Sequence, residues 1–77
     1  MALIRSFRRQ HMDRNSAHQA IDATYTPFER DGRVFIQIDT YGRVTRQDVG
    51  SKSQSFQLDR EGAIELFKIL RREFQLQ

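Results

Sequence analysis

Apolar and polar residues alternate along residues 21–26, and a period of two is typical of a strand with one buried face. Ile21, Ala23 and Tyr25 fall on one face, with aspartate and threonine on the other. Pro27 follows directly. Because proline cannot donate a hydrogen bond to a neighbouring strand, we expect this strand to end at a sheet edge or a bulge.

The dipeptide Asp31-Gly32 predicts a tight β-hairpin turn, because such turns need the positive φ angles that these residues adopt readily. The stretch after it, residues 33–41, has the clearest alternation in the chain. Its β-branched face is expected to pack in the core and contains Val34, Ile36, Ile38 and Thr40. Its other face contains Phe35, Gln37, Asp39 and Tyr41.

Residues 53–58 predict a further strand, in which Phe56 and Leu58 point into the core. The opposite face of this strand contains Ser53, Ser55 and Gln57. The connecting residues 42–52 are rich in basic and turn-forming residues, and the part near Val44–Val49 is a candidate short fourth strand.

A helix is predicted after this strand, with Asp59 as its N-cap and Glu61 in its first turn. Helical spacing places one apolar stripe at Ala63, Leu66, Phe67, Leu70 and Phe74. Ile64 flanks the stripe on one side, and the apolar arc is wider than one thin sheet needs. The helix therefore either packs under a curved sheet alone or also packs on a second copy. The second interpretation predicts a dimer interface containing Ile69, Leu70, Phe74 and Leu76.

These elements predict an α+β fold: a curved antiparallel sheet of three to four strands followed by one C-terminal helix. We expect a single domain at residues 20–77, dimerising through the helix. Residues 1–19 are polar and basic with weak periodicity, and we interpret them as a flexible N-terminal arm with one helical turn near Leu3–Gln10.

The composition limits what such a chain does. A chain of 77 residues buries only ~60% of its unfolded surface, so its core is thin. The absence of cysteine excludes disulfides, thiolate zinc sites and a cysteine nucleophile. Small domains without such links often gain stability by oligomerising. No apolar run approaches the ~20 residues that cross a bilayer, so we expect a cytoplasmic protein that makes no membrane contact.

The net charge of +3 is unevenly distributed. Residues 1–14 contain four arginines against Asp13, whereas residues 15–77 contain nine basic and nine acidic residues. Of the 13 cationic side chains, 11 are arginine, whose planar donor fork suits phosphates and stacks on flat rings. The abundance of arginine therefore favours nucleic acid as a partner, and the excess of positive charge lies in the N-terminal arm.

A sheet covered by one helix leaves its other face open, here the face that contains Phe35 and Gln37. An aromatic ring among amides and hydroxyls, framed by cations, is typical of surfaces that hold single-stranded nucleic acid. The predicted contacts are Arg33, Phe35, Gln37, Tyr41, Arg43, Arg46, Lys52 and Ser55. Two alternatives stay open: the arm or a partner subunit covers Phe35, and the basic loop is only a solvated hairpin tip.

The chain from about Ile21 to Phe74 resembles the single-stranded-DNA-binding domain of the transcriptional coactivator family called positive cofactor four. The similar features are the strand at residues 34–41, the basic stretch ending Gly50-Ser51-Lys52, the strand at residues 55–58 and the helix from Asp59. The resemblance implies a curved antiparallel sheet, a long helix that forms the dimer, and single-strand contacts at Arg33, Phe35, Gln37, Arg43, Arg46, Lys52 and Ser55. Residues 37–42 and 53–59 also resemble a small bacterial protein group, which implies a bacterial or mobile-element origin.

The sequence offers little support for a metal site or a catalytic site. His11 and His18 are seven residues apart without a third ligand fixed nearby, so we expect no metal and no cofactor. No nucleophile–base pair is placed together, and we expect no enzymatic activity. The sequence therefore predicts a non-enzymatic, homodimeric module for single-stranded DNA or RNA. The alternative is a small accessory or inhibitor module that docks on a larger protein through the same face or an edge strand.

Overall fold

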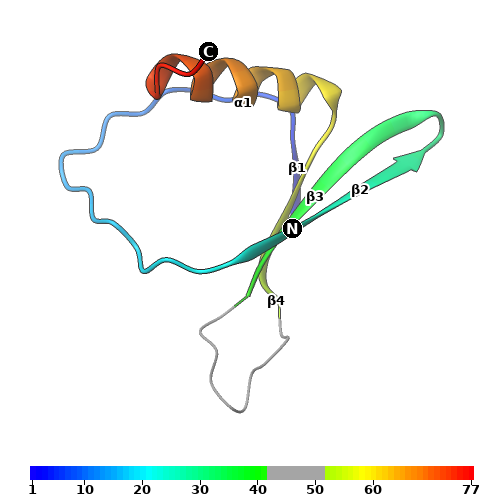
Figure 1. The fold of residues 1–77 in the computed structure, drawn as a ribbon, viewed down its shortest axis with the longest axis horizontal. Helices are drawn as coiled ribbons and strands as arrows, with labels where there is room; N and C mark the ends of the chain where they lie inside the picture. Colours follow the sequence, from blue (N-terminus) through cyan, green and yellow to red (C-terminus); the bar gives the residue numbers. More distant parts are fainter. Residues whose placement is uncertain (42–51) are drawn as a thin grey trace.

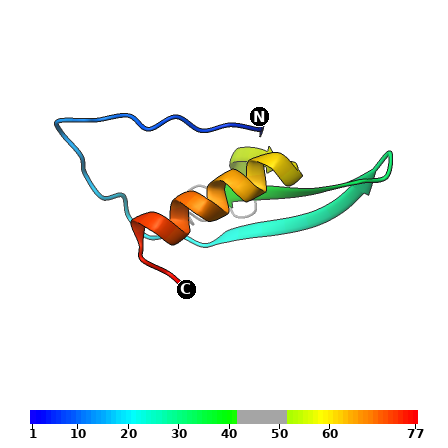
Figure 2. The same cartoon turned by 90° about the horizontal axis from the view of Figure 1, so that it is seen from above.

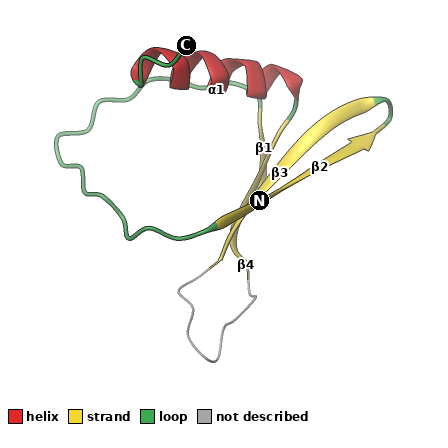
Figure 3. Ribbon diagram, in the orientation of Figure 1, coloured by secondary structure: helices red, strands yellow, loops and turns green. Residues whose placement is uncertain are grey.

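The structure is a computed structural model that describes residues 1–41 and 52–77. It contains an open four-stranded sheet followed by one C-terminal helix, which confirms the predicted α+β class (Figures 1 and 3). The elements are β1 (Ala2–Ile4), β2 (Ala23–Arg30), β3 (Arg33–Tyr41), β4 (Lys52–Leu58) and α1 (Arg60–Glu73). The candidate strand near Val44–Val49 lies outside the described residues.

The strands lie in the order β1-β4-β3-β2. β2, β3 and β4 are antiparallel, as predicted, whereas β1 adds a parallel strand beside β4, with Ala2 opposite Phe56 and Ile4 opposite Leu58. The helical turn expected near Leu3–Gln10 is wrong, because residues 2–4 are a strand and residues 5–22 form neither helix nor strand. The chain leaves β1 at the end of the sheet where α1 lies and then returns in a wide arc to the start of β2 (Figures 1 and 2).

The β2–β3 hairpin follows from its turn residues. Asp31 and Gly32 have φ angles of 54° and 75°, and two successive positive values define the tight turn that matches the twist of a hairpin. β3 has the predicted bounds, whereas β2 begins at Ala23 instead of residue 21 and continues through Pro27 to Arg30. Pro27 is tolerated there because β2 is an edge strand, one of the two positions expected for this proline.

One sheet face carries the apolar side chains and lies towards α1. Register places Ile36 opposite Leu58 and Ile38 opposite Phe56 on this face, which confirms the predicted alternation of β3 and β4. Among the described hydrophobic residues only Leu58 is buried, at 6% exposure, whereas Val34 is 60% exposed. The core is therefore thin, because α1 crosses one end of the sheet instead of covering its length (Figure 1).

The start of α1 packs against the sheet through backbone contact. Asp59 is the N-cap and its carboxylate accepts a hydrogen bond from the Gly62 N–H at 2.9 Å, as the sequence predicts for this residue. A Cβ atom at Gly62 would collide with the carbonyl oxygen of Ile4 and lie 3.3 Å from Leu58 Cδ2. Glycine is therefore needed here for the close approach of the first helical turn to β1.

Candidate nucleic-acid interface

The sheet face opposite the apolar one carries aromatic and polar side chains, and we call it the polar face. Cross-strand register places Phe28 beside Phe35, Gln57 beside Gln37, and Ser55 beside Asp39. Its described members are Thr24, Thr26, Phe28, Arg30, Arg33, Phe35, Gln37, Asp39, Tyr41, Ser55 and Gln57, with Leu3 of β1 beside Gln57. The structure thus brings together five of the predicted contacts: Arg33, Phe35, Gln37, Tyr41 and Ser55.

An aromatic stack lies at the hairpin end of the polar face. The rings of Phe28 and Phe35 have centroids 5.3 Å apart and planes inclined by 11°. The guanidinium carbon of Arg33 lies 5.3 Å from the centroid of the Phe35 ring, within reach of a cation–π interaction. Both phenylalanines are half-buried, so part of each ring remains accessible to solvent.

Phe28 is a site residue that the sequence reasoning did not identify. The alternation in the sequence predicts a strand that ends near Pro27, so it places Phe28 in the connection after it. The signal was nevertheless present, because a two-residue turn at Asp31-Gly32 pairs Arg30 with Arg33 and so pairs Phe28 with Phe35. Counting back from the turn would have found the cross-strand partner of Phe35.

A chain of hydrogen bonds runs across the middle of the polar face. Gln57 Nε2 donates to Gln37 Oε1 at 2.9 Å, and Gln37 Nε2 donates to Asp39 Oδ1 at 3.0 Å. The Ser55 hydroxyl also donates to Asp39, whose exposure is only 3%. Because an ionised carboxylate only accepts hydrogen bonds, Asp39 sets the direction of both amides. The Gln57 carbonyl oxygen is then the acceptor at the end of this chain.

Tyr41 lies beyond this hydrogen-bond chain, at the end of β3 away from the hairpin turn. Its hydroxyl and that of Thr24 share a hydrogen bond of 3.0 Å. The contact links β3 to the edge strand β2 and restrains the ring on the polar face. Tyr41 is half-buried, so it is a second aromatic group available to a flat ligand.

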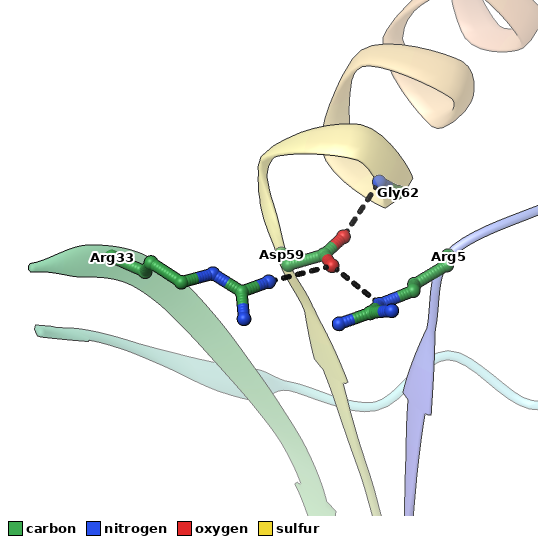
Figure 4. Close-up of polar contacts among 4 residues, drawn as sticks. All are labelled: Arg5, Arg33, Asp59 and Gly62. Atoms are coloured by element: carbon green, nitrogen blue, oxygen red, sulfur yellow. Dashed lines mark hydrogen bonds and ion pairs between the residues drawn. The ribbon is translucent and has the colours of Figure 1, made fainter. Parts of the chain in front are cut away.

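Three segments meet at Asp59, at the edge of the polar face (Figure 4). Asp59 Oδ2 lies 2.8 Å from Arg5 Nε and 3.4 Å from Arg33 Nη2. The hydrogen bond from the Gly62 backbone lowers the pKa of Asp59, and the hydrogen bond and charge of Arg5 and the charge of Arg33 lower it further against the opposing effect of burial. The ion pair holds Arg33 between Asp59 and the Phe35 ring, with about half of its side chain exposed.

Arg5 is a second residue that the predicted contacts omitted. It follows β1 directly and contributes a second cation to the Asp59 cluster. Two guanidinium groups against one carboxylate leave a local positive charge beside the aromatic stack. The basic composition of residues 1–14 was the available signal, but only the pairing of β1 with β4 places Arg5 here.

The remaining predicted contacts are only partly described. Arg43 and Arg46 lie outside the described residues, and Lys52 is located by its backbone, which pairs with Tyr41. Of the predicted interface residues, Ile69 is half-buried, whereas Leu70, Phe74 and Leu76 are exposed.

The beginning of the chain borders the polar face at β1. A pocket of about 240 Å³ there is lined by Met1, Ala2, Leu3, Gln37, Ser55, Phe56 and Gln57. At this pocket the first residues of the chain therefore lie beside the amides of Gln37 and Gln57.

Within residues 1–41 and 52–77, no three histidine or acidic side chains gather as metal ligands, and His11 Nε2 lies 3.0 Å from Asp13 Oδ1.

In the same described ranges, no helix has the length and apolar character needed to span a bilayer.

Comparison with known proteins adds no relative. The chain matches no protein-family model, and no curated protein or solved structure among those compared matches it. The resemblance to positive cofactor four therefore stays a prediction from the sequence.

Proposed function

We propose that this protein is a non-enzymatic, homodimeric module that binds single-stranded DNA or RNA on its polar face. The observation that carries the proposal is the stack of Phe28 on Phe35 beneath Arg33, on a sheet face that α1 does not cover. The bacterial origin and cytoplasmic location inferred from the sequence belong to the same proposal.

The aromatic stack supplies the sequence-independent part of the binding. Unstacked bases gain ~1–3 kcal/mol each on an aromatic ring, and every base has a flat face to offer. Arg33 is oriented by Asp59 and extends the platform with a planar cation that donates to phosphate or stacks on a base. A duplex hides its base faces, so this platform favours single strands.

The hydrogen-bond chain supports the same proposal. Gln37 and Gln57 have their amides oriented by Asp39, so a base edge meets donors and acceptors in fixed positions. Preorganised amides reduce the entropy lost on binding. Tyr41, farther along the face, provides a second stacking surface.

The N-terminal segment supplies cations for contacts with the nucleic-acid backbone. Residues 1–14 contain the whole charge excess, and Arg5 lies beside the platform through its pairing with Asp59. The other three arginines are at positions 8, 9 and 14 and are exposed. Cations along the path of a bound nucleic-acid strand contact its phosphates and release the counterions held there. The affinity for nucleic acid therefore falls as the salt concentration rises.

Fluorescence anisotropy tests the proposal directly. Labelled single-stranded DNA, single-stranded RNA and duplex DNA of equal length are titrated with the protein at 50 mM and 200 mM salt. We expect binding to a single strand that exceeds duplex binding and weakens with salt, and a loss of about tenfold or more in Phe35→Ala. Tyr25→Ala is the matched control, because Tyr25 is an exposed aromatic residue on the opposite face of β2. Absence of binding at 50 mM salt would refute the proposal.

The alternative function is docking on a larger protein. β2 lies at the sheet edge over Ala23–Arg30, and an edge strand of this length can accept a strand from another protein. Under this alternative, oligonucleotides do not bind at low salt. A protein partner would then protect the β2 amide hydrogens from exchange, whereas nucleic acid on the polar face would leave the outer edge of β2 exchanging.

A further inference from the structure

An apolar groove lies between α1 and the sheet. It measures about 640 Å³, and its apolar lining comes from three sheet residues and three helical residues, namely Val34, Ile36, Leu58, Ala63, Ile64 and Phe67. The groove is open to solvent, because Ile64 and Phe67 are 42% and 54% exposed and Val34 is 60% exposed. Its volume lies in the range of ~300–1,000 Å³ that is typical of sites for small organic molecules. The four residues predicted at a dimer interface do not line it.

Three cations border the groove. Arg60, Lys68 and Arg71 belong to its lining, and none of them forms an ion pair with a described residue. The one acidic side chain in the lining is Asp59, whose carboxylate is already paired with two arginines from other segments. Complementary charge favours one ligand over another, so this apolar groove with a cationic border fits a ligand that is both apolar and anionic.

The cations have defined places along the groove. Arg60, Ile64, Phe67 and Arg71 are separated by four, three and four residues, so they form one stripe along α1. A helix rises about 1.5 Å per residue, so the two arginines are roughly 16 Å apart along the helix axis. Lys68 comes three residues before Arg71 and adds a second charge at that end. The groove therefore offers an apolar path that begins at two neighbouring cations.

The lining favours an alkyl chain over a peptide or a second copy. An extended peptide would bring backbone N–H and C=O groups that six apolar side chains cannot pair, and a buried polar group without a partner costs free energy. A second α1 helix laid along the same stripe would bring its own Arg60 and Arg71 to a border that is already cationic. An alkyl chain has no polar groups, and about twelve carbons in extended form cover most of the distance between the arginines.

We propose that the groove binds a fatty acid, with its alkyl chain against Ile64 and Phe67 and its carboxylate between Lys68 and Arg71. A carboxylate accepts hydrogen bonds from both cations, and the planar fork of the arginine guanidinium matches its two oxygens. The alkyl chain covers the exposed part of Phe67 and the facing Val34, which removes apolar surface from water. The groove lies on the apolar sheet face, opposite the polar face, so its occupancy does not require nucleic acid.

Isothermal titration calorimetry of the full chain with octanoate, decanoate and dodecanoate, each below its micelle-forming concentration, tests the alkyl-chain contact. We expect each added methylene to tighten binding by up to about fourfold, because it is buried in the groove. Dodecyltrimethylammonium has a chain of the same length and a positive head group, and it should bind at least about tenfold more weakly than dodecanoate. Equal affinity for these two amphiphiles, or no gain in affinity with chain length, would overturn the proposal.

Two matched pairs of variants locate the site. Phe67→Glu places an anion in the groove and should weaken dodecanoate binding about 100-fold, whereas Ile21→Glu is its control, because Ile21 is 53% exposed and lies outside the groove. Arg71→Ala should weaken binding about tenfold, whereas Arg72→Ala is its control, because Arg72 does not line the groove and contacts Glu73 at 3.5 Å. The second pair changes only exposed side chains, so it keeps the site testable if Phe67→Glu does not fold. Equal effects within the second pair would contradict the carboxylate contact.

Native mass spectrometry distinguishes the other occupants of the groove. One dodecanoate per chain, on a monomer or on a dimer, supports the fatty-acid site. A dimer that takes up no dodecanoate would identify a second copy as the occupant. Binding to phosphatidylglycerol vesicles without binding of monomeric dodecanoate would identify a membrane surface instead. Either of the last two results would overturn the fatty-acid site.

Discussion

Phe28 and Phe35 stack across the β2–β3 hairpin with ring centroids 5.3 Å apart, and the two residues are directly opposite in the antiparallel register. An aromatic cross-strand pair stabilises a sheet by roughly 0.2–1 kcal/mol relative to two alanines. The stack also joins the two side chains into one aromatic unit at the hairpin end of the polar face. Each ring therefore supports the position of the other on the polar face.

Removal of either ring should weaken single-strand binding to a similar degree. Phe28→Ala is expected to reduce affinity for a single-stranded oligonucleotide about tenfold, because it removes one stacking surface and loosens Phe35. The double variant should lose less than the sum of the two single losses in free energy, since contacting residues couple. Anisotropy titrations of the four proteins of this double-mutant cycle measure the coupling. Additive losses would show that the two rings act independently.

The sequence predicts those elements that are determined by residues close to one another in the chain. β3 is long and alternates strictly, so its bounds were predictable, and the turn at Asp31-Gly32 and the N-cap Asp59 each have their own residue chemistry. β1 has three residues, too few to show a period, and it exists because the outer edge of β4 and the first turn of α1 accept it. The proximity of Arg5 to Arg33 depends on this pairing and has no local signal.

Gly62→Ala should destabilise the protein although alanine is the better helix former. In an exposed helix this substitution gains about 1 kcal/mol. Here the new methyl group collides with the Ile4 carbonyl, and relief of such overpacking costs roughly 1–3 kcal/mol through displacement of β1. Urea unfolding gives the change in the free energy of unfolding. In a chain lacking residues 1–4 the same substitution should become neutral or stabilising, and an unchanged sign there would contradict the proposed contact.

Acid should destabilise the protein in part through Asp59. The folded state lowers the pKa of Asp59 below its ordinary value, so the ionised form contributes stability that is fully present above about pH 4 and is lost as the pH falls through the folded-state pKa. Asp59→Asn keeps an N-cap acceptor and removes the charge that Arg5 and Arg33 contact. The free energy of unfolding of this variant should fall less between pH 5 and pH 2 than that of the wild type. If the free energy of unfolding, measured with urea, falls equally with pH in the two proteins, the charge of Asp59 contributes no stability.

Gln75→Gly should stabilise the end of α1. Gln75 has a φ of 55°, and its N–H and that of Leu76 return to the carbonyl oxygens of Arg72 and Arg71, which is a helix stop that glycine favours. A residue with a Cβ atom pays roughly 1 kcal/mol in this left-handed conformation, so glycine should raise the free energy of unfolding by about that amount. Gln77→Gly is the control, because Gln77 follows the stop and should not change stability. Thermal and urea unfolding of both variants give the comparison, and equal stabilities would show that the left-handed residue does not limit this helix end.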